Sequence, residues 1–526
     1  MALRNLSMEV YRRTKTFFQE VNGGVQEATL CIGRQPNRGC PEKRIFSMWS
    51  TEIKNADSAP DLFRRLGLRR GTFWIDGSKA SFMGFAPRVQ LIIDADGASR
   101  RIENGRVTPG RQSPMDALLE FVREAGSIAP GSAIPRTIGF LSYELGPFLE
   151  GRIAARSSRD PALPLAWFGT YDAVASCIPV SPDNRDLCSV RIESSQAQSG
   201  EALLAALTEA APEPSRAESK PSTLLESPQW DEYAQAIARA QEYIRAGDIY
   251  QVNLARRFRV SSPLLPWEVY LRLRAEQPVP YGSFLDTGTF SILSNSPERF
   301  LRREGDEIRT EPIKGTRRRD SDRATDQRLA RQLLDDPKER AEHIMIVDLE
   351  RNDLGRLCEE GSVEVSSLLR LESFKTLHHL VSTIEGRLMA GKDLGDILRA
   401  TFPGGSITGT PKIRATEVIA ELEPQGRGPY TGAIVWLGNQ GNFDSSIAIR
   451  TAIAHEGNYS YSAGGGIVAD SDPSREYAEC WLKARVFLNT LLGPSHADAL
   501  LRKAQESSAG ANPCPGGTAA STKESR

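Results

Sequence analysis

The segment YSAGGGIV, residues 461–468, precedes the helical segment REYAEC, residues 475–480. Its composition predicts a strand that runs into a glycine-rich turn. Three consecutive glycines let the backbone approach a ligand closely and direct N–H groups at a carboxylate. The turn does not match GxGxxG, and no acidic ribose-binding residue follows at the required spacing, so the pattern argues against dinucleotide binding.

Two predicted helices each carry a pair of glutamates three residues apart. Glu476 and Glu479 form one pair, and Glu339 and Glu342 form the other. This spacing places both carboxylates of a pair on one helix face. If the two faces converge, their oxygens can hold Mg²⁺ directly or through its waters. Taken alone, each pair is better explained as a solvated face that is ion-paired with neighbouring lysines and arginines.

Cationic side chains lie close to these glutamates in the sequence. Arg450 follows the run SSIAI, residues 445–449, and Lys483 lies one helical turn beyond Glu479. An arginine offers a planar, bidentate fork to a carboxylate. Each cation alone is explained by a surface ion pair, but together with the glycines they indicate an anionic substrate.

Lys314 lies in the segment EPIKGT, residues 311–316. A lysine beside a flexible glycine and among carboxylates can act as a nucleophile if burial or a nearby cation lowers its pKa toward neutrality. Most lysines are solvated surface charges, so this residue gains meaning only from the motifs around it.

The composition defines a class of protein rather than a function. The chain has 526 residues, 40% hydrophobic and 25% charged residues, and a net charge of −1, with no bias toward nucleic acid or anionic membranes. Its seven cysteines lack CxxC or CxxH spacing and are interpreted as reduced thiols. No signal-peptide core and no 18-residue apolar run are present, so we expect a cytoplasmic protein.

Changes in composition divide the chain into five segments. Residues 70–190 alternate short apolar runs with turns and predict a sheet-rich lobe, with a helix over 115–125. Residues 231–246 predict a helix that Gly247 ends. The predicted segments are an extension of unknown role (1–45), an N-terminal lobe (46–210), a proline-containing linker (211–228), a catalytic domain (229–492) and a disordered tail (493–526).

Seven ordered motifs make the chain similar to the chorismate-binding enzymes. The resemblance is dense over residues 231–492 and thinner over 73–173. It implies an α+β fold in which two large, mostly antiparallel β-sheets pack together, with helices outside and the active site in the cleft. The motifs are IYQVNL (249–254), SPERF (296–300), PIKGT (312–316), EH with IVDL (342–349), FPGGS with PK (402–412), GPYTG (428–432) and the stretch 463–483.

The lysine of PIKGT is typical of the branch that resembles aminodeoxychorismate synthase component I, whereas the anthranilate branch reads PIAGT. The resemblance implies that Glu342 and Glu479 hold Mg²⁺ and that Glu339 and Glu476 reach it through water. It further implies a pocket for the chorismate carboxylates and ring, formed by Gly315, Thr316, Ser406, Tyr430, Arg450, Gly464, Gly465, Gly466 and Lys483.

Catalytic roles follow from the same resemblance. Glu298 would be the general acid and base that protonates the departing C4 hydroxyl, which requires a pKa raised by burial. Lys314 would attack C2 of chorismate, and ammonia would then attack C4 and expel the lysine. His379 matches a histidine close to the departing hydroxyl, although a lone histidine is often structural.

Gln251 distinguishes this chain from isochorismate and salicylate synthases, which resemble it but have a water-activating lysine at this position. A neutral amide argues against delivery of hydroxide to C2. The sequence shows neither a glutamine-hydrolysing domain nor a lyase. We therefore expect ammonia from a separate glutamine amidotransferase subunit, no nucleic-acid or membrane partner, and 4-amino-4-deoxychorismate as a product on the way to 4-aminobenzoate and folate.

Two alternatives stay open at this point. One is anthranilate synthase component I, which Lys314 disfavours. The other is a non-catalytic homologue that only binds a glutaminase. Residues 75–77 (IDG) and 280–282 (PYG) differ from the LES and PYM runs of the tryptophan-inhibited branch, so feedback inhibition is not expected. Structural binding of tryptophan is left undecided.

Overall fold

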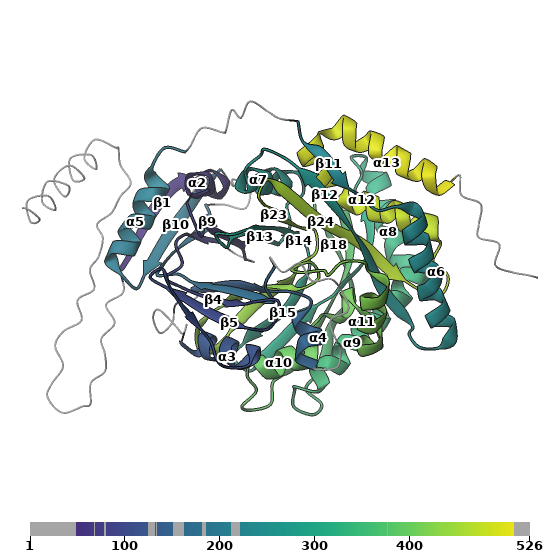
Figure 1. The fold of residues 1–526 in the computed structure, drawn as a ribbon, viewed down its shortest axis with the longest axis horizontal. Helices are drawn as coiled ribbons and strands as arrows, with labels where there is room; N and C mark the ends of the chain where they lie inside the picture. Colours follow the sequence, from purple (N-terminus) through teal and green to yellow (C-terminus); the bar gives the residue numbers. More distant parts are fainter. Residues whose placement is uncertain are drawn as a thin grey trace, which may run out of the picture.

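The protein is described by a computed structural model that covers residues 49–67, 69–77, 80–124, 132, 134–150, 163–180, 186–211, 221–375 and 377–509. Within these residues the strands form two antiparallel sheets of twelve strands each. The sheets face each other and the helices lie around them (Figure 1). The predicted α+β class with two large antiparallel sheets and outer helices is confirmed.

The first sheet combines strands from both halves of the sequence. Its order is β1 (Trp49–Asp57), β10 (Leu187–Ser194), β9 (Ala173–Pro179), β3 (Ser81–Gly84), β2 (Phe73–Asp76), β13 (Tyr281–Asp286), β14 (Ser291–Ser296), β23 (Thr451–His455), β24 (Asn458–Ile467), β12 (Gln251–Ser261) and β11 (Thr223–Glu226), with β20 (Gly409–Thr410) paired to β12.

The second sheet is built in the same way. Its order is β17 (Ile313–Arg318), β19 (Leu377–Arg387), β16 (Glu307–Glu311), β15 (Arg299–Glu304), β22 (Phe443–Ile447), β21 (Ala433–Leu437), β7 (Thr137–Leu141), β8 (Ala166–Thr170), β4 (Val89–Ile93), β5 (Ser99–Glu103) and β6 (Arg106–Pro109), with β18 (Glu364–Ser373) paired to β19.

The sheets do not follow the lobes expected from sequence. β2 pairs with β13 in the first sheet, and β7 pairs with β21 in the second, so each sheet crosses the 211–228 segment. That segment also contains β11. The division into two lobes at residues 211–228 therefore stays a prediction. Each β-sheet contains strands from both sides of this segment.

The two sheets share apolar contacts. Phe73 of β2, Phe140 of β7 and Trp436 of β21 belong to one buried cluster, which joins strands of both sheets. Every residue of β7 and β21 is buried. Strands covered on both faces require continuous rather than alternating apolar runs, and TIGFL and AIVWL provide them.

The helices begin and end at residues with clear local reasons. The predictions over 115–125 and 231–246 are confirmed as α3 and α6, and Gly247 ends α6 in the left-handed conformation (φ 81°). The helices are α2 (Ala59–Leu66), α3 (Pro114–Glu124), α4 (Leu145–Glu150), α5 (Ala197–Thr208), α6 (Trp230–Ala246), α7 (Pro266–Glu276), α8 (Arg323–Asp335), α9 (Pro337–Gly355), α10 (Leu394–Thr401), α11 (Lys412–Leu422), α12 (Pro473–Leu492) and α13 (Pro494–Ala509), with 3-10 turns η1 (Gly405–Ile407) and η2 (Asn439–Gly441).

Helices α9 and α12 start in the same way. Asp336 caps α9 and Asp472 caps α12, and a proline follows each aspartate at the first helical position. Glu339 and Glu476 therefore fall in the first helical turns, where backbone N–H groups favour negative charge. The cap fixes where each glutamate pair begins.

Two sequence predictions need correction. Residues 464–466 do not form a turn: they lie inside β24 and pair with β12, because small residues let the two backbones approach closely. The predicted disordered tail, 493–526, begins with helix α13, whose buried Ala497 and Ala504 belong to the main core. Residues 510–526 and the extension 1–45 lie outside the described residues.

None of the described helices combines the length and apolar character needed to cross a bilayer.

Candidate active site

The two glutamate pairs approach Lys314 from two helices. Glu342 of α9 and Glu479 of α12 both interact electrostatically with its ammonium group. A Cβ atom placed on Gly465 would lie 2.8 Å from Glu476 Oε2 and 4.0 Å from Glu479 Oε1. The α12 pair thus lies over β24 of the first sheet, while Lys314 lies on β17 of the second. The predicted convergence of the two helix faces occurs between the two sheets.

The second pair is tied to β17. A Cβ atom placed on Gly315 would lie 3.2 Å from Glu339 Oε2. Arg317, further along β17, contacts Glu339 Oε1 at 3.2 Å and Asp336 at 2.9 Å. β17 therefore carries the lysine and also a cation that holds the start of α9.

The ion pairing that the sequence raised as an alternative is present at these glutamates. Lys338 Nζ lies 3.9 Å from Glu342 Oε1, and Lys483 Nζ lies 2.7 Å from Glu479 Oε1. Burial raises the pKa of Glu342 and of Glu476, whereas Lys483 lowers the pKa of Glu479. Across the described ranges, no three acidic, histidine or cysteine side chains are arranged as a metal site. Glu342 and Glu479 are thus each paired with a lysine ammonium group.

Lys314 is held in a distorted part of β17. The pairing of β17 with β19 shifts register between Lys314 and Thr316, and Gly315 has φ 74°, a value that favours glycine. Burial lowers the pKa of Lys314, while Glu298 acts in the opposite direction. A lysine with a lowered pKa has a larger fraction of neutral, nucleophilic amine at pH 7.

Glu298 lies in the loop between β14 and β15 with only 3% of its surface exposed. The Ser406 hydroxyl donates to Glu298 Oε1 at 2.8 Å, and the Ile313 N–H donates to the same oxygen at 3.4 Å. Burial raises the pKa of Glu298 to about 7, although Ser406 and Lys314 oppose the shift. The carboxyl can therefore both give and accept a proton near neutral pH.

His379 faces β17 from β19. Its Nδ1 lies 3.1 Å from Thr316 Oγ1 and 3.3 Å from the Gly315 carbonyl oxygen. Burial, followed by the charge of Arg450, lowers the pKa of His379 to about 4. The imidazole is neutral at pH 7, so it can orient Thr316 and Gly315 but does not supply a cationic acid.

The predicted anion-binding residues lie on the first-sheet side. Lys483 Nζ donates to the Gly464 carbonyl oxygen at 2.7 Å. Arg450, with φ 52°, donates to Gln277 Oε1 at 3.3 Å and interacts electrostatically with Glu479 and His379. Arg450 and Lys483 thus bring positive charge to the region around Glu479.

Tyr430 is placed differently from the other site residues. It is buried and lines a cavity of about 380 Å³ that also includes Ser142, Arg257 and Ser460. Neither Lys314 nor Glu298 lines this cavity. Burial raises the pKa of Tyr430, and the negative charges of ionised Cys480 and Tyr461 act in the same direction. Tyr430 is therefore close to these two residues. It therefore lies between the cavity and β24.

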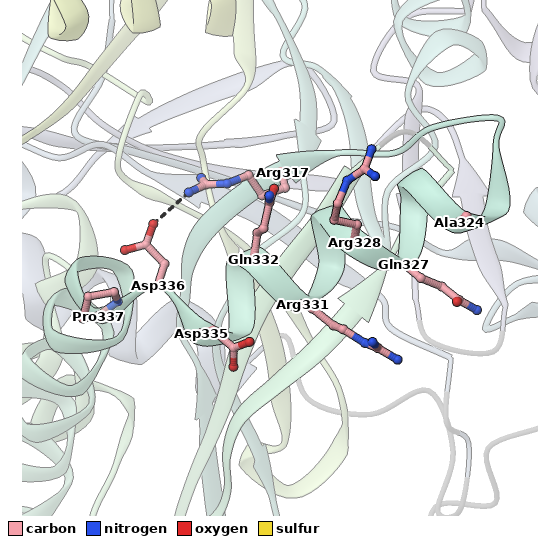
Figure 2. A pocket seen from close by; sticks show the side chains of 9 residues that line it. All are labelled: Arg317, Ala324, Gln327, Arg328, Arg331, Gln332, Asp335, Asp336 and Pro337. Atoms are coloured by element: carbon pink, nitrogen blue, oxygen red, sulfur yellow. Dashed lines mark hydrogen bonds and ion pairs between the residues drawn. The ribbon is translucent and has the colours of Figure 1, made fainter.

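A second hollow, a groove of about 810 Å³, runs over α8 (Figure 2). Figure 2 shows the Arg317 guanidinium reaching Asp336, while Arg331 and Gln327 point away from this contact. The groove is lined mainly by exposed side chains of α8. None of its lining residues is a predicted site residue.

Two buried polar groups lie outside the predicted set of catalytic, substrate-binding and metal-binding residues. Gln251 is fully buried, and its side-chain amide has no hydrogen-bond partner among the residues that the structure describes. A Cβ atom on Gly466 would lie 2.8 Å from Gln251 Nε2, so the amide faces the glycine run. Glu350 is the other, on α9. It lies eleven residues after Glu339, which is three helical turns, and this spacing was the available sequence signal.

Two glycine substitutions separate folding from site geometry. In Gly464→Ala the new Cβ would lie 1.9 Å from the Leu254 carbonyl oxygen, a backbone atom that cannot move away. We expect it to lower the free energy of unfolding by at least about 2 kcal/mol. In Gly465→Ala the closest atom is the end of the flexible Glu476 side chain.

We therefore expect Gly465→Ala to keep the wild-type denaturation midpoint but to lower activity by displacing Glu476. Urea denaturation of both variants, with activity assays on the folded one, measures this difference. Equal destabilisation by both substitutions would contradict the packing described for β24 and β12.

The chain was compared with known proteins. The family model of the chorismate binding enzymes matches residues 71–489. Aminodeoxychorismate synthase component 1 of Klebsiella aerogenes is 41% identical over 360 residues, which cover 67% of this chain and 76% of that protein. Anthranilate synthase component 1 of Thermus thermophilus is 48% identical over 261 residues, which cover 49% of this chain and 56% of that protein.

A solved structure shows the same fold. The crystal structure of anthranilate synthase component I from Streptococcus pneumoniae superposes with a TM-score of 0.67 at 30% identity, covering 77% of this chain and 91% of that chain. Residues 71–489, which the family model matches, contain both glutamate pairs, Lys314 and Glu298. The chain belongs to the family of chorismate-binding enzymes.

Proposed function

We propose that this protein is the chorismate-aminating component of an aminodeoxychorismate synthase. It would act in the cytoplasm and convert chorismate and ammonia to 4-amino-4-deoxychorismate, with ammonia supplied by a separate glutamine amidotransferase subunit. The observation that carries the proposal is the pairing of Lys314 with Glu298. Lys314 is a partly buried amine with a lowered pKa, and it interacts with the carboxyl of Glu298, whose pKa is raised to about 7.

The first displacement uses this pair of residues. The neutral Lys314 amine forms a bond to C2 of chorismate, the ring double bonds shift, and the C4–oxygen bond breaks. Glu298 gives its proton to the departing hydroxyl, which leaves as water. Because Glu298 retains its proton up to a pKa of about 7, it is protonated in a large share of molecules at neutral pH.

The second displacement reverses the shift. Ammonia forms a bond to C4, the double bonds move back, and the C2–Nζ bond of Lys314 breaks. Glu298, now a carboxylate, takes the proton that the incoming nitrogen loses. Both residues return to their starting states, so the cycle needs no further acid or base.

The residues also fit a magnesium ion. Mg²⁺ prefers oxygen ligands and retains several waters, and the donor set here is four carboxylates. Burial raises the pKa of Glu342 and of Glu476, and the neighbouring carboxylates Glu339 and Glu479 act in the same direction, a repulsion that a cation would relieve. Glu342 and Glu479 would hold the ion, with Glu339 and Glu476 acting through water. When bound, it would neutralise and orient the chorismate carboxylates.

The nearest alternative is anthranilate synthase component I, the name carried by the Thermus and Streptococcus relatives. A specific residue argues against it, because an amine at position 314 offers a covalent route that this reaction does not need. A non-catalytic glutaminase-binding homologue is the other alternative, and the competent acid, base and nucleophile argue against it.

One assay separates the proposed function from its two alternatives. The pure protein is incubated with chorismate, Mg²⁺ and ammonium, and the aminated product is identified. We expect 4-amino-4-deoxychorismate, which an added lyase converts to 4-aminobenzoate. Anthranilate formed without a lyase would support the first alternative. Absence of any product at saturating Mg²⁺, together with binding to a glutaminase, would support the second.

Glu342→Gln tests the metal assignment. The amide keeps the size of the side chain but removes its charge, so we expect the Mg²⁺ concentration for half-maximal activity to rise at least roughly tenfold. Because Glu342 is partly exposed at the helix surface, the fold should persist. Titration of activity with Mg²⁺ measures the shift.

Asp348→Asn provides the matched control on the same helix, because Asp348 is exposed and pairs only with Arg351 in the described region. It should retain the wild-type Mg²⁺ response. An unchanged response in Glu342→Gln would show that this carboxylate does not hold the ion.

A further inference from the structure

Glu350 is a buried carboxyl that the proposed reaction does not use. It lies on α9 with 7% of its surface exposed. The Thr310 hydroxyl, on β16, donates to Glu350 Oε2 at 2.7 Å. A buried carboxylate is stable only when charged or polar partners compensate the loss of water. The partners of Glu350 therefore decide whether it carries a proton.

No cation forms an ion pair with Glu350 among the residues that the structure describes. Lys412 of α11 interacts electrostatically with Glu350, but its Nζ donates to Asp353 Oδ2 at 2.5 Å and to the Thr401 carbonyl oxygen at 2.8 Å. Asp353, one turn further along α9, thus takes the cation. A single neutral hydroxyl does not compensate a buried negative charge, so Glu350 retains its proton.

The electrostatic surroundings agree with this conclusion. Burial, together with the negative charges of Glu298 and Asp353, raises the pKa of Glu350 to about 8, while Thr310 and Lys412 act in the opposite direction. Glu298 is therefore close enough for its charge to affect Glu350.

Glu298 and Glu350 are held by the same two backbone segments. Ser406 donates to Glu298, and a Cβ atom on the adjacent Gly405 would lie 3.9 Å from Glu350 Cγ. Thr310 contacts Glu350, and the N–H of Ile313, three residues later, contacts Glu298. The two carboxyls are thus neighbours beneath the substrate site.

We propose that Glu350 is a positioning residue for Glu298. As a neutral carboxyl, Glu350 allows Glu298 to release its proton without placing two negative charges side by side in the buried floor of the site. This inference rests on the proposed function, in which Glu298 becomes anionic during the first displacement. If Glu350 were ionised, release of the Glu298 proton would create adjacent buried anions, and Glu298 would be a weaker acid.

The pH dependence of chorismate consumption tests this role. Above pH 8 the wild type loses activity through ionisation of both carboxyls, whereas Glu350→Gln has a neutral group at every pH. We expect kcat/KM of the wild type to fall more steeply than that of the variant, by an extra factor of about ten per pH unit. At pH 7 the two enzymes should differ by less than about threefold, since Glu350 is already neutral there.

A second variant moves the same transition. Thr310→Val removes the hydroxyl that favours the ionised form of Glu350. The extra alkaline loss should then begin at a higher pH than in the wild type. A purely structural role for Glu350 would leave the alkaline slope of Glu350→Gln unchanged, and that result would overturn the proposal.

Infrared spectroscopy of the free enzyme gives a readout that needs no activity. A protonated-carboxyl C=O band at pH 7.5 should be present in the wild type and in Thr310→Val, and should be weaker in Glu350→Gln. An identical band in Glu350→Gln would contradict a protonated Glu350. If the chain makes a different product, the band difference persists while the product assay fails, so the two failures are distinguishable.

Discussion

Replacing Lys314 by alanine is expected to lower formation of 4-amino-4-deoxychorismate by about 10³-fold or more, because the variant lacks the nucleophile of the first displacement. Lys314 lies on an edge strand and is not part of the apolar core, so the fold should survive. Chorismate, ammonia and the glutamates of α9 and α12 can still meet in the variant. A slow, direct attack of ammonia on C2 would then yield anthranilate.

The measurement is chromatographic identification of products from chorismate, Mg²⁺ and ammonium. Lys503→Ala on α13 is the matched control, because it removes an exposed lysine far from β17 in sequence. It should keep wild-type rates. Undiminished aminodeoxychorismate formation by Lys314→Ala would contradict covalent catalysis.

Glu298→Gln is expected to have the second-largest effect, a loss of about 10²–10⁴-fold in kcat/KM, because the departing hydroxyl loses its proton donor. The amide oxygen can still accept from Ser406, so the pocket keeps its shape. The wild-type rate should fall as pH rises through about 7, the pKa of Glu298. The variant should lack this transition, and pH profiles of both proteins test it.

The same substitution should stabilise the fold. The pKa of Glu298 is about 7 in the folded protein, above its unfolded value, so the wild type loses stability as pH rises from about 4.5 to 7 and the loss persists above that range. Glu298→Gln removes this penalty, which is up to about 3 kcal/mol at pH 8. At pH 4 the two proteins should have similar stability. A lower denaturation midpoint for the variant at pH 8 would contradict a buried, uncompensated carboxyl.

The residues of the candidate site were chosen from short motifs, and their roles stay predictions. Spacing alone placed Glu339 with Glu342, and Glu476 with Glu479, on single helix faces. The sequence could not show that the two faces meet, because that depends on β17 and β24 belonging to different sheets. The ion pairs of Lys338 with Glu342 and of Lys483 with Glu479 match the local alternative that the spacing also suggested.

The fold was expected from the resemblance and not from residue patterns. Periodicity located α3 and α6, but the pairing of β2 with β13 and of β7 with β21 joins residues far apart in the sequence. No local pattern encodes such contacts.

The errors share one cause, which is tertiary context. Gly464 to Gly466 suggest a turn locally, yet they form part of β24 because β12 lies against them. The polar composition after Leu492 suggests disorder, yet apolar positions such as Ala497 and Ala504 bury one face of α13. Glu350 was overlooked because its meaning depends on the burial of α9 beside Glu298.

The most direct test of a lysine nucleophile is to trap its adduct. The enzyme is mixed with chorismate and Mg²⁺ without ammonia, and the reaction is quenched with acid. The protein is then digested, and the masses of its peptides are measured by mass spectrometry. The account predicts that the peptide containing Lys314 gains the mass of chorismate less one water, and that ammonia removes this species. If 4-amino-4-deoxychorismate forms on addition of ammonia while no such adduct appears on Lys314 at any time, the central claim is contradicted.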